Sequence, residues 1–219
     1  NHLNPPFDNV KARQALLHMV KQEHYLQAII GDEKFWRACG AYFMCDTPLD
    51  SDVGAGPLMN QDLETASRLL KAGGYNGETL ILMDPTDIPV LHGASLVTAQ
   101  MLRKIGAKVE VQAMDWSTLT SRRAETKSIA DGGWNIFHTY STGADVASPI
   151  ANIGVSGGCV EEAWFGWPCD KMLEDLRDQF SRESDPAKQV EIGVALQKRA
   201  YEVVPYVNYG QWFQPTAYR

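Results

Sequence analysis

Residues 79–112 read TLILMDPTDIPVLHGASLVTAQMLRKIGAKVEVQ, and this stretch predicts a β-α-β unit. Residues 79–83 form a continuous apolar run of strand length, whereas residues 108–112 alternate as a half-buried strand does. Residues 90–104, between the two strands, have the length and apolar spacing of a helix. Strands joined by a crossover helix run parallel, so the unit predicts an α/β fold.

Helix and strand signals continue to alternate on both sides of this unit. A helix closed by Gly73 and Gly74 is expected, because glycine suits the left-handed turn that ends helices. Pro186 directly after Asp185 is a helix start signal. The further expected elements are a helix over 8–30 with a break near Lys21, a loop over 31–60, helices over 62–72, 116–126, 171–180 and 186–203, and strands over 134–140 and 206–213.

The composition is that of a soluble globular chain. Its 219 residues, 44% of them hydrophobic, suffice for a sizeable core, and no repeat or linker divides them, so we expect a single α/β domain over residues 1–219. The net charge of −7 with scattered Lys and Arg disfavours a nucleic-acid partner. No apolar run approaches the roughly 20 residues that a membrane helix needs.

The opening of the chain predicts that it is a piece of something larger. Asn4-Pro-Pro-Phe-Asp-Asn-Val-Lys-Ala-Arg-Gln-Ala-Leu16 begins with an extended Pro-Pro entry and a helix start, with nothing in front of them. Asp8 is placed to accept hydrogen bonds from the first free N–H groups of that helix. A secretory leader, if the protein is exported, lies outside this sequence.

Four segments resemble one protein family. Residues 4–16 resemble the "PPFDD-x-x-x-RQA" segment of the large periplasmic solute-binding proteins of ABC importers, family 5, which bind dipeptides, oligopeptides or nickel. Residues 63–75 are similar to that family's "A-x-x-LL-x-x-AGY" helix and cap, and residues 99–111 to its "Q-x-x-L-x-x-IG-x-x-V" unit. Residues 185–207 resemble its return towards the hinge. The four segments follow the family order.

The resemblance implies a fold, a function and partners. The fold would be one lobe of a type II periplasmic-binding-protein-like structure, a mixed sheet flanked by helices, and this chain the second, C-terminal lobe of a two-lobed protein. Such a protein binds a solute, most simply a peptide, outside the cytoplasm, and delivers it to an ABC permease in the inner membrane. A periplasmic monomer without cofactor or catalytic activity is expected. An isolated lobe should fold alone but bind its solute weakly.

The four cysteines form two local pairs, Cys39 with Cys45 and Cys159 with Cys169. Two short disulfide loops are the preferred interpretation, and each would stabilise the fold by about 2–3 kcal/mol on the chain-entropy model. Free buried thiols and a metal site are the alternatives, although the spacings differ from those of a zinc knuckle. Disulfides would agree with an oxidising compartment such as the periplasm.

The candidate ligand site lies after the third predicted strand, in residues 134–149. Ligand-facing loops follow the carboxyl ends of parallel strands, here after Met83, Gln112 and Tyr140. By the resemblance, Asp145 is the ionic anchor for a ligand ammonium group. Its alternative role is the N-cap of a short helix. The residues expected to supply hydroxyl and backbone contacts are Tyr140, Ser141, Thr142 and Gly143.

Aromatic side chains in loops form a second candidate surface, because flat rings can line a cleft and stack on a ligand. Trp36, Trp167 and Trp212 are the chosen candidates, although any single aromatic residue of this kind is more often part of the core. The other aromatic residues of this group are Phe43, Trp164, Phe165 and Phe213.

One feature departs from the peptide-binding pattern. No Arg or Lys lies between Leu80 and Gln100, where a relative could anchor the ligand's carboxylate, and His92 there is expected to be structural. The anchor would then come from the missing lobe, or the solute is not a free peptide. A stand-alone binding domain for an opine, a glycan or a metal chelate is therefore the alternative function.

A serine hydrolase is the remaining alternative, because Gly154-Val-Ser-Gly-Gly158 matches the G-x-S-x-G nucleophile elbow. In an α/β-hydrolase the catalytic histidine follows the serine. Here every histidine precedes Ser156, so the order is wrong for that fold.

Overall fold

The computed structural model describes residues 1–215 and centres on a three-stranded parallel sheet with the order β3-β2-β4. The central strand β2 (Thr79–Pro85) pairs with β3 (Lys108–Met114) along its whole length and with β4 (Ile136–Phe137) at Leu82 and Met83. All residues of β2 after Thr79 are buried, which explains its continuous apolar run.

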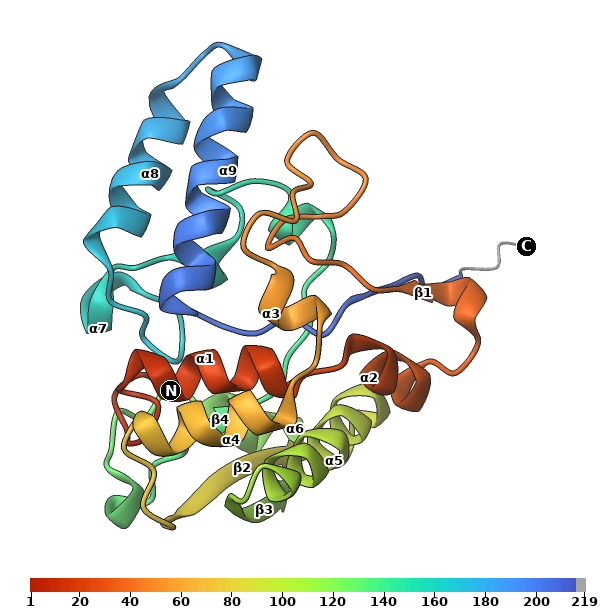
Figure 1. The fold of residues 1–219 in the computed structure, drawn as a ribbon, viewed down its shortest axis with the longest axis vertical. Helices are drawn as coiled ribbons and strands as arrows, with labels where there is room; N and C mark the ends of the chain where they lie inside the picture. Colours follow the sequence, from red (N-terminus) through yellow and green to blue (C-terminus); the bar gives the residue numbers. More distant parts are fainter. Residues whose placement is uncertain (216–219) are drawn as a thin grey trace.

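Helices cover the sheet and extend beyond it (Figure 1). The crossover helix α5 (Pro89–Lys104) packs on β2 and β3 and against α2 (Gln22–Ile29). A second layer pairs α1 (Val10–Met19) with α4 (Leu63–Ala72). At Gly73 a Cβ atom would lie only 2.5 Å from the backbone N of Ala12, so these two helices can approach this closely only with glycine there.

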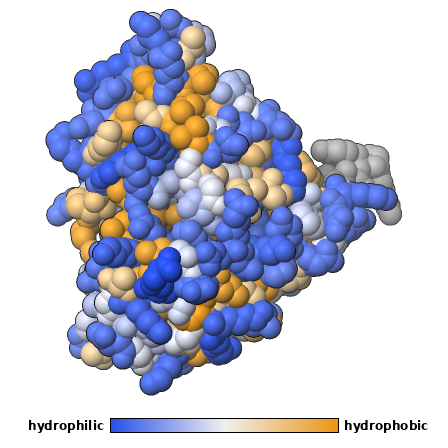
Figure 2. Space-filling model, in the orientation of Figure 1, coloured by the Kyte–Doolittle hydropathy of each residue, from blue (hydrophilic) through white to orange (hydrophobic). Residues whose placement is uncertain are grey.

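The C-terminal helices form a hairpin away from the sheet. In Figure 1, α8 (Lys171–Arg182) and α9 (Pro186–Val203) rise together, and Figure 2 shows hydrophobic surface among hydrophilic side chains in that region. The short elements are α3 (Gly56–Met59), α6 (Trp116–Arg122), α7 (Cys159–Glu162), the 3-10 turns Glu33–Phe35, Ile129–Asp131, Ala144–Val146 and Ile153–Val155, and the strands β1 (Trp36–Arg37) and β5 (Gln211–Trp212).

One large hydrophobic core connects the elements. It joins Leu17 of α1, Leu70 of α4, Leu80 of β2, Leu102 of α5 and Leu196 of α9, all at most 2% exposed. A smaller cluster contains Ile81, Met83, Leu119, Trp134 and Trp167. The helices of the C-terminal hairpin therefore share a core with the sheet.

The predicted α/β class and the helix break near Lys21 are confirmed, since α1 ends at Met19 and α2 begins at Gln22. The extended Pro-Pro entry is wrong: residues 5–8 form a turn in which the N–H of Asp8 donates to the carbonyl of Asn4. The N-cap of α1 is also Asn9 and not Asp8, because the Asn9 side chain accepts from the N–H of Lys11.

Of the strand predicted over 134–140, only β4 forms. Just before β4, a side chain replaces part of the backbone hydrogen bonding that would continue the sheet. The N–H of Asn135 donates to the Ile81 carbonyl at 3.0 Å, and the Asn135 side-chain oxygen accepts from the Ile81 N–H at 2.8 Å. Its Nδ2 donates to the Pro5 carbonyl at 2.9 Å. One buried carboxamide thus joins β2, β4 and the start of the chain.

The strand predicted over 206–213 is likewise only β5, which pairs antiparallel with β1 in a separate sheet. Residues before β5 are fixed by side chains instead. The Tyr42 hydroxyl donates to the carbonyl of Tyr206 at 2.9 Å, and Asn208 donates to the carbonyl of Ala41 at 3.0 Å.

Both predicted cysteine pairs are disulfide bonds, Cys39 with Cys45 and Cys159 with Cys169. Free thiols and a metal knuckle are therefore wrong for these four residues. The first disulfide closes a loop beside the return of the chain to β5, and the second closes the loop that contains α7.

We predict that Asn135→Ala lowers the free energy of unfolding by about 2–3 kcal/mol, because buried backbone groups of Ile81 and Pro5 lose their partners. The exposed Asn76 provides the control, and Asn76→Ala should change stability by about 0.5 kcal/mol or less. Urea unfolding followed by circular dichroism measures both. Equal stability of the two variants would contradict the role given to the Asn135 carboxamide.

Candidate functional site

A cavity of about 1380 Å³ lies beside the loop that follows β4. Three segments form most of its wall: residues 134–146, residues 39–44 of the first disulfide loop, and residues 204–215 of the return. Its size exceeds the roughly 300–1,000 Å³ of an ordinary small-molecule pocket. A solute of several residues or rings would fit such a space.

The loop after β4 is held against the disulfide loop. The N–H of Met44 donates to the carbonyl of Val146 at 3.3 Å. Gly143 lies so close that a Cβ atom there would come within 2.7 Å of the Met44 sulfur. The two loops therefore form one continuous surface, and the glycine permits their contact.

Asp145 is an exposed carboxylate on this surface. Its Oδ2 accepts hydrogen bonds from the Thr142 N–H and from the Thr142 hydroxyl, both at 2.8 Å. These two bonds hold the pKa of Asp145 below its usual range, so the group is an anion at neutral pH. Within residues 1–215 only Oδ2 is used in this way, and Oδ1 can meet a ligand cation.

The structure does not show the alternative role of Asp145, the N-cap of a short helix. Asp145 lies inside the turn Ala144–Val146, whose N-cap is Gly143, and its carboxylate reaches back to Thr142. The hydrogen bonds close the loop locally.

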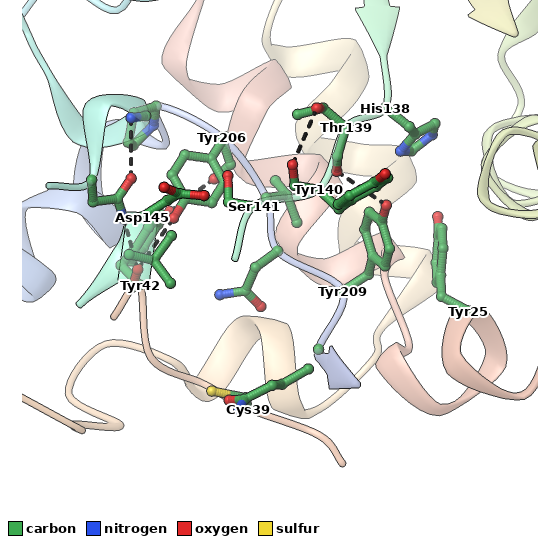
Figure 3. A pocket seen from close by; sticks show the side chains of 18 of the residues that line it. Tyr25, Cys39, Tyr42, His138, Thr139, Tyr140, Ser141, Asp145, Tyr206 and Tyr209 are labelled. Carbon is green, nitrogen blue, oxygen red and sulfur yellow. Dashed lines mark hydrogen bonds between the residues drawn. The ribbon is translucent and has the colours of Figure 1, made fainter. Parts of the chain in front are cut away.

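Tyrosines form two groups at opposite ends of the cavity (Figure 3). At one end the rings of Tyr42 and Tyr206 lie 5.0 Å apart and edge to face, near Asp145. At the other end Tyr25 stacks on Tyr209 at 5.2 Å and shares a hydrogen bond with the Thr98 hydroxyl. Burial raises the pKa of Tyr25 and of Tyr206 to about 12, so both hydroxyls stay neutral.

His138 lines the cavity between β4 and the predicted contact residues. Its ring meets Tyr209 edge to face at 5.6 Å, and its buried Nε2 has no hydrogen-bond partner in residues 1–215. Burial lowers the pKa of His138 to about 4, so the imidazole is neutral at pH 7. The histidine adds a neutral polar group to the wall.

The structure brings together most of the predicted site. Six of the predicted residues line the cavity, namely Tyr140, Ser141, Thr142, Gly143, Asp145 and Trp212. Tyr140 and Trp212 meet edge to face with their ring centroids 5.8 Å apart. Phe43, Trp164, Phe165 and Phe213 also line it.

Two of the predicted aromatic residues do not line the cavity. Trp167 is 5% exposed and packs 5.8 Å from Trp134 in the smaller core. Trp36 pairs with Trp212 across β1 and β5, with its indole N–H directed to the Gly31 carbonyl, and is not part of the cavity wall. Of this pair only Trp212 belongs to residues 204–215, which line the cavity.

The segments that follow β2 and β3 contribute little to the cavity wall. Of the segment after β2, Val90 reaches the cavity, and the loop after β3 does not line it. His92 is structural, as expected: its Nδ1 lies 2.8 Å from a carboxylate oxygen of Asp84, which is buried. Sequence reasoning missed Tyr206 and Tyr209 as site residues, although Tyr206 lies inside the family-like segment 185–207 and Tyr209 lies just after it.

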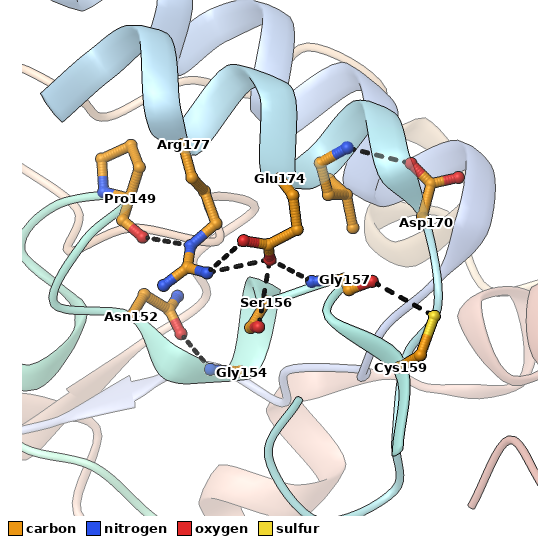
Figure 4. Close-up of polar contacts among 10 residues, drawn as sticks. Pro149, Asn152, Gly154, Ser156, Gly157, Cys159, Asp170, Glu174 and Arg177 are labelled. Atoms are coloured by element: carbon orange, nitrogen blue, oxygen red, sulfur yellow. Dashed lines mark hydrogen bonds and ion pairs between the residues drawn. The ribbon is translucent and has the colours of Figure 1, made fainter. Parts of the chain in front are cut away.

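Ser156 has the surroundings of a structural residue (Figure 4). Its hydroxyl donates to a carboxylate oxygen of Glu174 at 3.0 Å, and the same oxygen accepts from the Gly157 N–H. Arg177 binds both oxygens of Glu174 and the carbonyl of Pro149. This network fastens the G-x-S-x-G loop to α8, and no histidine takes part in it.

Two further properties concern the described part of the chain, residues 1–215. It has no cluster of three or more His, Cys, Asp or Glu side chains arranged to hold a metal ion. None of its helices combines the length and the apolar character needed to cross a bilayer.

Solved structures share this architecture. The periplasmic binding protein AgaA of A. tumefaciens in complex with agropinic acid aligns with a TM-score of 0.77 at 20% identity, over 95% of this chain and 41% of its own. A dipeptide-binding protein from Pseudoalteromonas in complex with Met-Leu gives a TM-score of 0.68 at 19% identity, over 92% and 39%. The fold is that of a type II periplasmic binding protein.

The sequence places the chain in a family. Residues 1–159 match the model described as bacterial extracellular solute-binding proteins, family 5, middle part, and the chain belongs to this family. It is 35% identical over all 219 residues to a "probable peptide ABC transporter periplasmic-binding protein" of Sinorhizobium fredii. Over 140 residues, which are 64% of this chain, it is 29% identical to the glutathione-binding protein GsiB of Pectobacterium atrosepticum. The chain spans 41% and 26% of the lengths of these two relatives.

We predict that His138 makes the fold sensitive to acid. Because burial lowers its pKa to about 4 from 6.5, the unfolded chain takes up a proton between these pH values that the native state does not. Stability is therefore lost as pH falls from 6.5 to 4, by up to about 1.4 kcal/mol per pH unit for this group. His138→Gln should flatten the dependence of the urea midpoint on pH.

The exposed His24 on α2 supplies the matched control, and His24→Gln should retain the acid sensitivity. Some slope should remain in His138→Gln, because burial also lowers the pKa of His2, to about 2. Identical slopes for the wild type and His138→Gln would contradict the prediction.

Proposed function

We propose that this chain is the C-terminal lobe of a two-lobed extracytoplasmic binding protein, and that it forms half of the site for a small solute. The observation that carries the proposal is the cavity of about 1380 Å³ at the carboxyl end of β4, into which Asp145 and its hydroxyl-bearing neighbours face. Parallel strands commonly present ligand loops at this edge. The role is binding, without catalysis.

A peptide is the proposed solute. Asp145 is positioned to hold the ligand's ammonium group, and the Tyr140 and Trp212 rings offer an aromatic surface for side chains. The name of the Sinorhizobium relative and the Met-Leu complex of the Pseudoalteromonas protein support this choice. Opines or glycans would use the same aromatic surface, and they belong in the ligand panel.

The proposed partner is an ABC permease in the inner membrane, reached from the periplasm by a monomeric complete protein. Closure of a second lobe over the cavity would exclude water and strengthen the Asp145 contact. Delivery of the solute then requires the lobes to open again at the permease. We propose that residues 1–219 form one α/β domain and that this domain closes against the second lobe as a unit.

A ligand screen on two proteins tests the half-site. The complete gene product and this chain alone are each screened by thermal shift against dipeptides, oligopeptides, opines, sugars and metal chelates. We expect a solute that raises the melting temperature of the complete protein and leaves that of the chain unchanged, because half a cleft lacks the second lobe's contacts. Equal shifts in both would mean that this chain holds a complete site.

We predict that Asp145→Asn weakens binding of a peptide with a free amino terminus on the order of 10- to 100-fold, because a charge-assisted hydrogen bond is lost. Asp115 is the control: it also accepts from the N–H and the hydroxyl of the residue three positions on, Thr118, with one bond on each carboxylate oxygen, but it lies outside the cavity wall. Asp115→Asn should leave the affinity unchanged. Calorimetry on the complete protein measures the affinity of both variants. An equal loss of affinity in both would contradict the role proposed for Asp145.

A further inference from the structure

The two disulfides of the chain differ in their exposure to solvent. Cys39 and Cys45 are 6% and 8% exposed, and they pack in a small cluster of their own with Ala41. In the second disulfide Cys169 is exposed and Cys159 is half-buried. A thiolate breaks a disulfide by attacking one of its sulfur atoms, so the rate depends on access to that atom. A reductant in the solvent therefore reaches the second disulfide more readily than the first.

The second disulfide closes a loop with an unfavourable backbone. Cys159 has a φ of 61° and Trp167 a φ of 53°, which place both residues in the left-handed region. For residues other than glycine this region costs free energy, and it persists only where the surroundings enforce it. Beside the disulfide, a hydrogen bond of 3.0 Å from the Cys159 N–H to the Pro168 carbonyl closes the loop. The disulfide is thus the covalent part of what holds this conformation.

The same loop carries part of the cavity wall. Trp164 and Phe165 line the cavity, and the Trp164 ring lies 5.8 Å from the ring of Phe137 on β4. Two residues further on, Trp167 is buried in the smaller core. The conformation of the loop therefore sets the positions of two aromatic rings in the wall.

Both ends of the loop are fastened independently of the disulfide (Figure 4). Before the loop, the Gly157 N–H donates to Glu174 of α8 at 2.6 Å. After it, the Asp170 carboxylate accepts from Arg199 of α9 at 2.6 Å. The Asp170 N–H also donates to the Gly157 carbonyl at 2.9 Å. Loss of the disulfide would free the loop and leave the helical hairpin in place.

We propose that the Cys159–Cys169 disulfide is a redox switch of the cavity wall, which a dithiol reduces while the Cys39–Cys45 disulfide stays intact. A thiolate of the dithiol attacks the sulfur of Cys169, and Cys159 leaves as a thiolate. The second thiol then attacks the dithiol's own sulfur in the mixed disulfide, which releases Cys169 as a thiolate and leaves the dithiol oxidised to a disulfide. Two electrons pass to the protein, and its new thiolates take up the two protons that the dithiol loses.

Reduction acts on the wall through the freedom of the loop. Without the covalent closure, the left-handed residues relax, and Trp164 and Phe165 lose their fixed positions. A loose wall must be ordered each time a solute binds, which opposes binding. The reduced form should therefore bind on the order of 10-fold more weakly. This effect on binding rests on the proposed function, whereas the reduction itself does not.

Differential thiol labelling tests which disulfide is reduced. The complete gene product is treated with dithiothreitol in native buffer, free thiols are blocked with N-ethylmaleimide, and the labelled peptides are identified by mass spectrometry. We expect label on Cys159 and Cys169 at dithiothreitol concentrations that leave Cys39 and Cys45 unlabelled, and label on all four after unfolding in urea. Simultaneous labelling of both pairs, earlier labelling of Cys39 and Cys45, or no labelling before unfolding would each overturn the proposal.

Hydrogen exchange on the same protein tests whether the loop is released. Reduction should speed amide exchange in residues 159–169 and leave it unchanged in α8 and β2. The double variant Cys159→Ser, Cys169→Ser should show the fast exchange without reductant and should not respond to dithiothreitol. Unchanged exchange in the loop, or faster exchange throughout the chain, would contradict the switch, since the disulfide would then be inert or a general staple.

Calorimetry with Met-Leu measures the effect on binding in the oxidised and the reduced complete protein. The affinity of the wild type should fall on the order of 10-fold on reduction, and that of the double variant should be low with or without dithiothreitol. Equal affinity of both forms despite a released loop would overturn the link to the cavity. A protein that binds Met-Leu in neither form would contradict the proposed peptide, and labelling and exchange would still decide on the switch.

Discussion

The fold depends on the hydrogen bonds of the Asn135 carboxamide. Parallel strands cannot be joined by a tight turn, so the third strand must be brought to the sheet from far along the chain. Asn135 does this with both ends of its side chain, which accepts from Ile81 and donates to Pro5. The backbone nitrogen of Asn1 donates to the carbonyl of the same residue at 2.9 Å. The start of the chain, the central strand and the strand that leads into the cavity thus meet at one buried polar group.

More of the fold than of the candidate site could be predicted from the sequence. A continuous apolar run placed β2, the periodic spacing of apolar residues placed α5 and β3, and Asp185-Pro186 placed the start of α9. These patterns failed for β4 and β5, where Asn135, Tyr42 and Asn208 make side-chain hydrogen bonds in place of a ladder. Such bonds join residues more than 50 positions apart, and local pattern does not encode them.

The same limit applies to the site. The loop from Tyr140 to Asp145 could be predicted because it follows a strand and because the family resemblance directs attention there. Trp167 and Trp212 could not be told apart, since the same residue type serves the smaller core in one case and the cavity in the other.

The short disulfide between Cys39 and Cys45 has a consequence for how a solute is received. The loop that it closes presents Tyr42, Phe43 and Met44 to the cavity. A flexible loop would lose conformational freedom each time a solute enters, which opposes binding. Here the covalent bond removes that freedom once, when the protein is oxidised after synthesis. In the proposed two-lobed binding protein, this wall is shaped before a solute arrives, and only the lobes would have to move during capture.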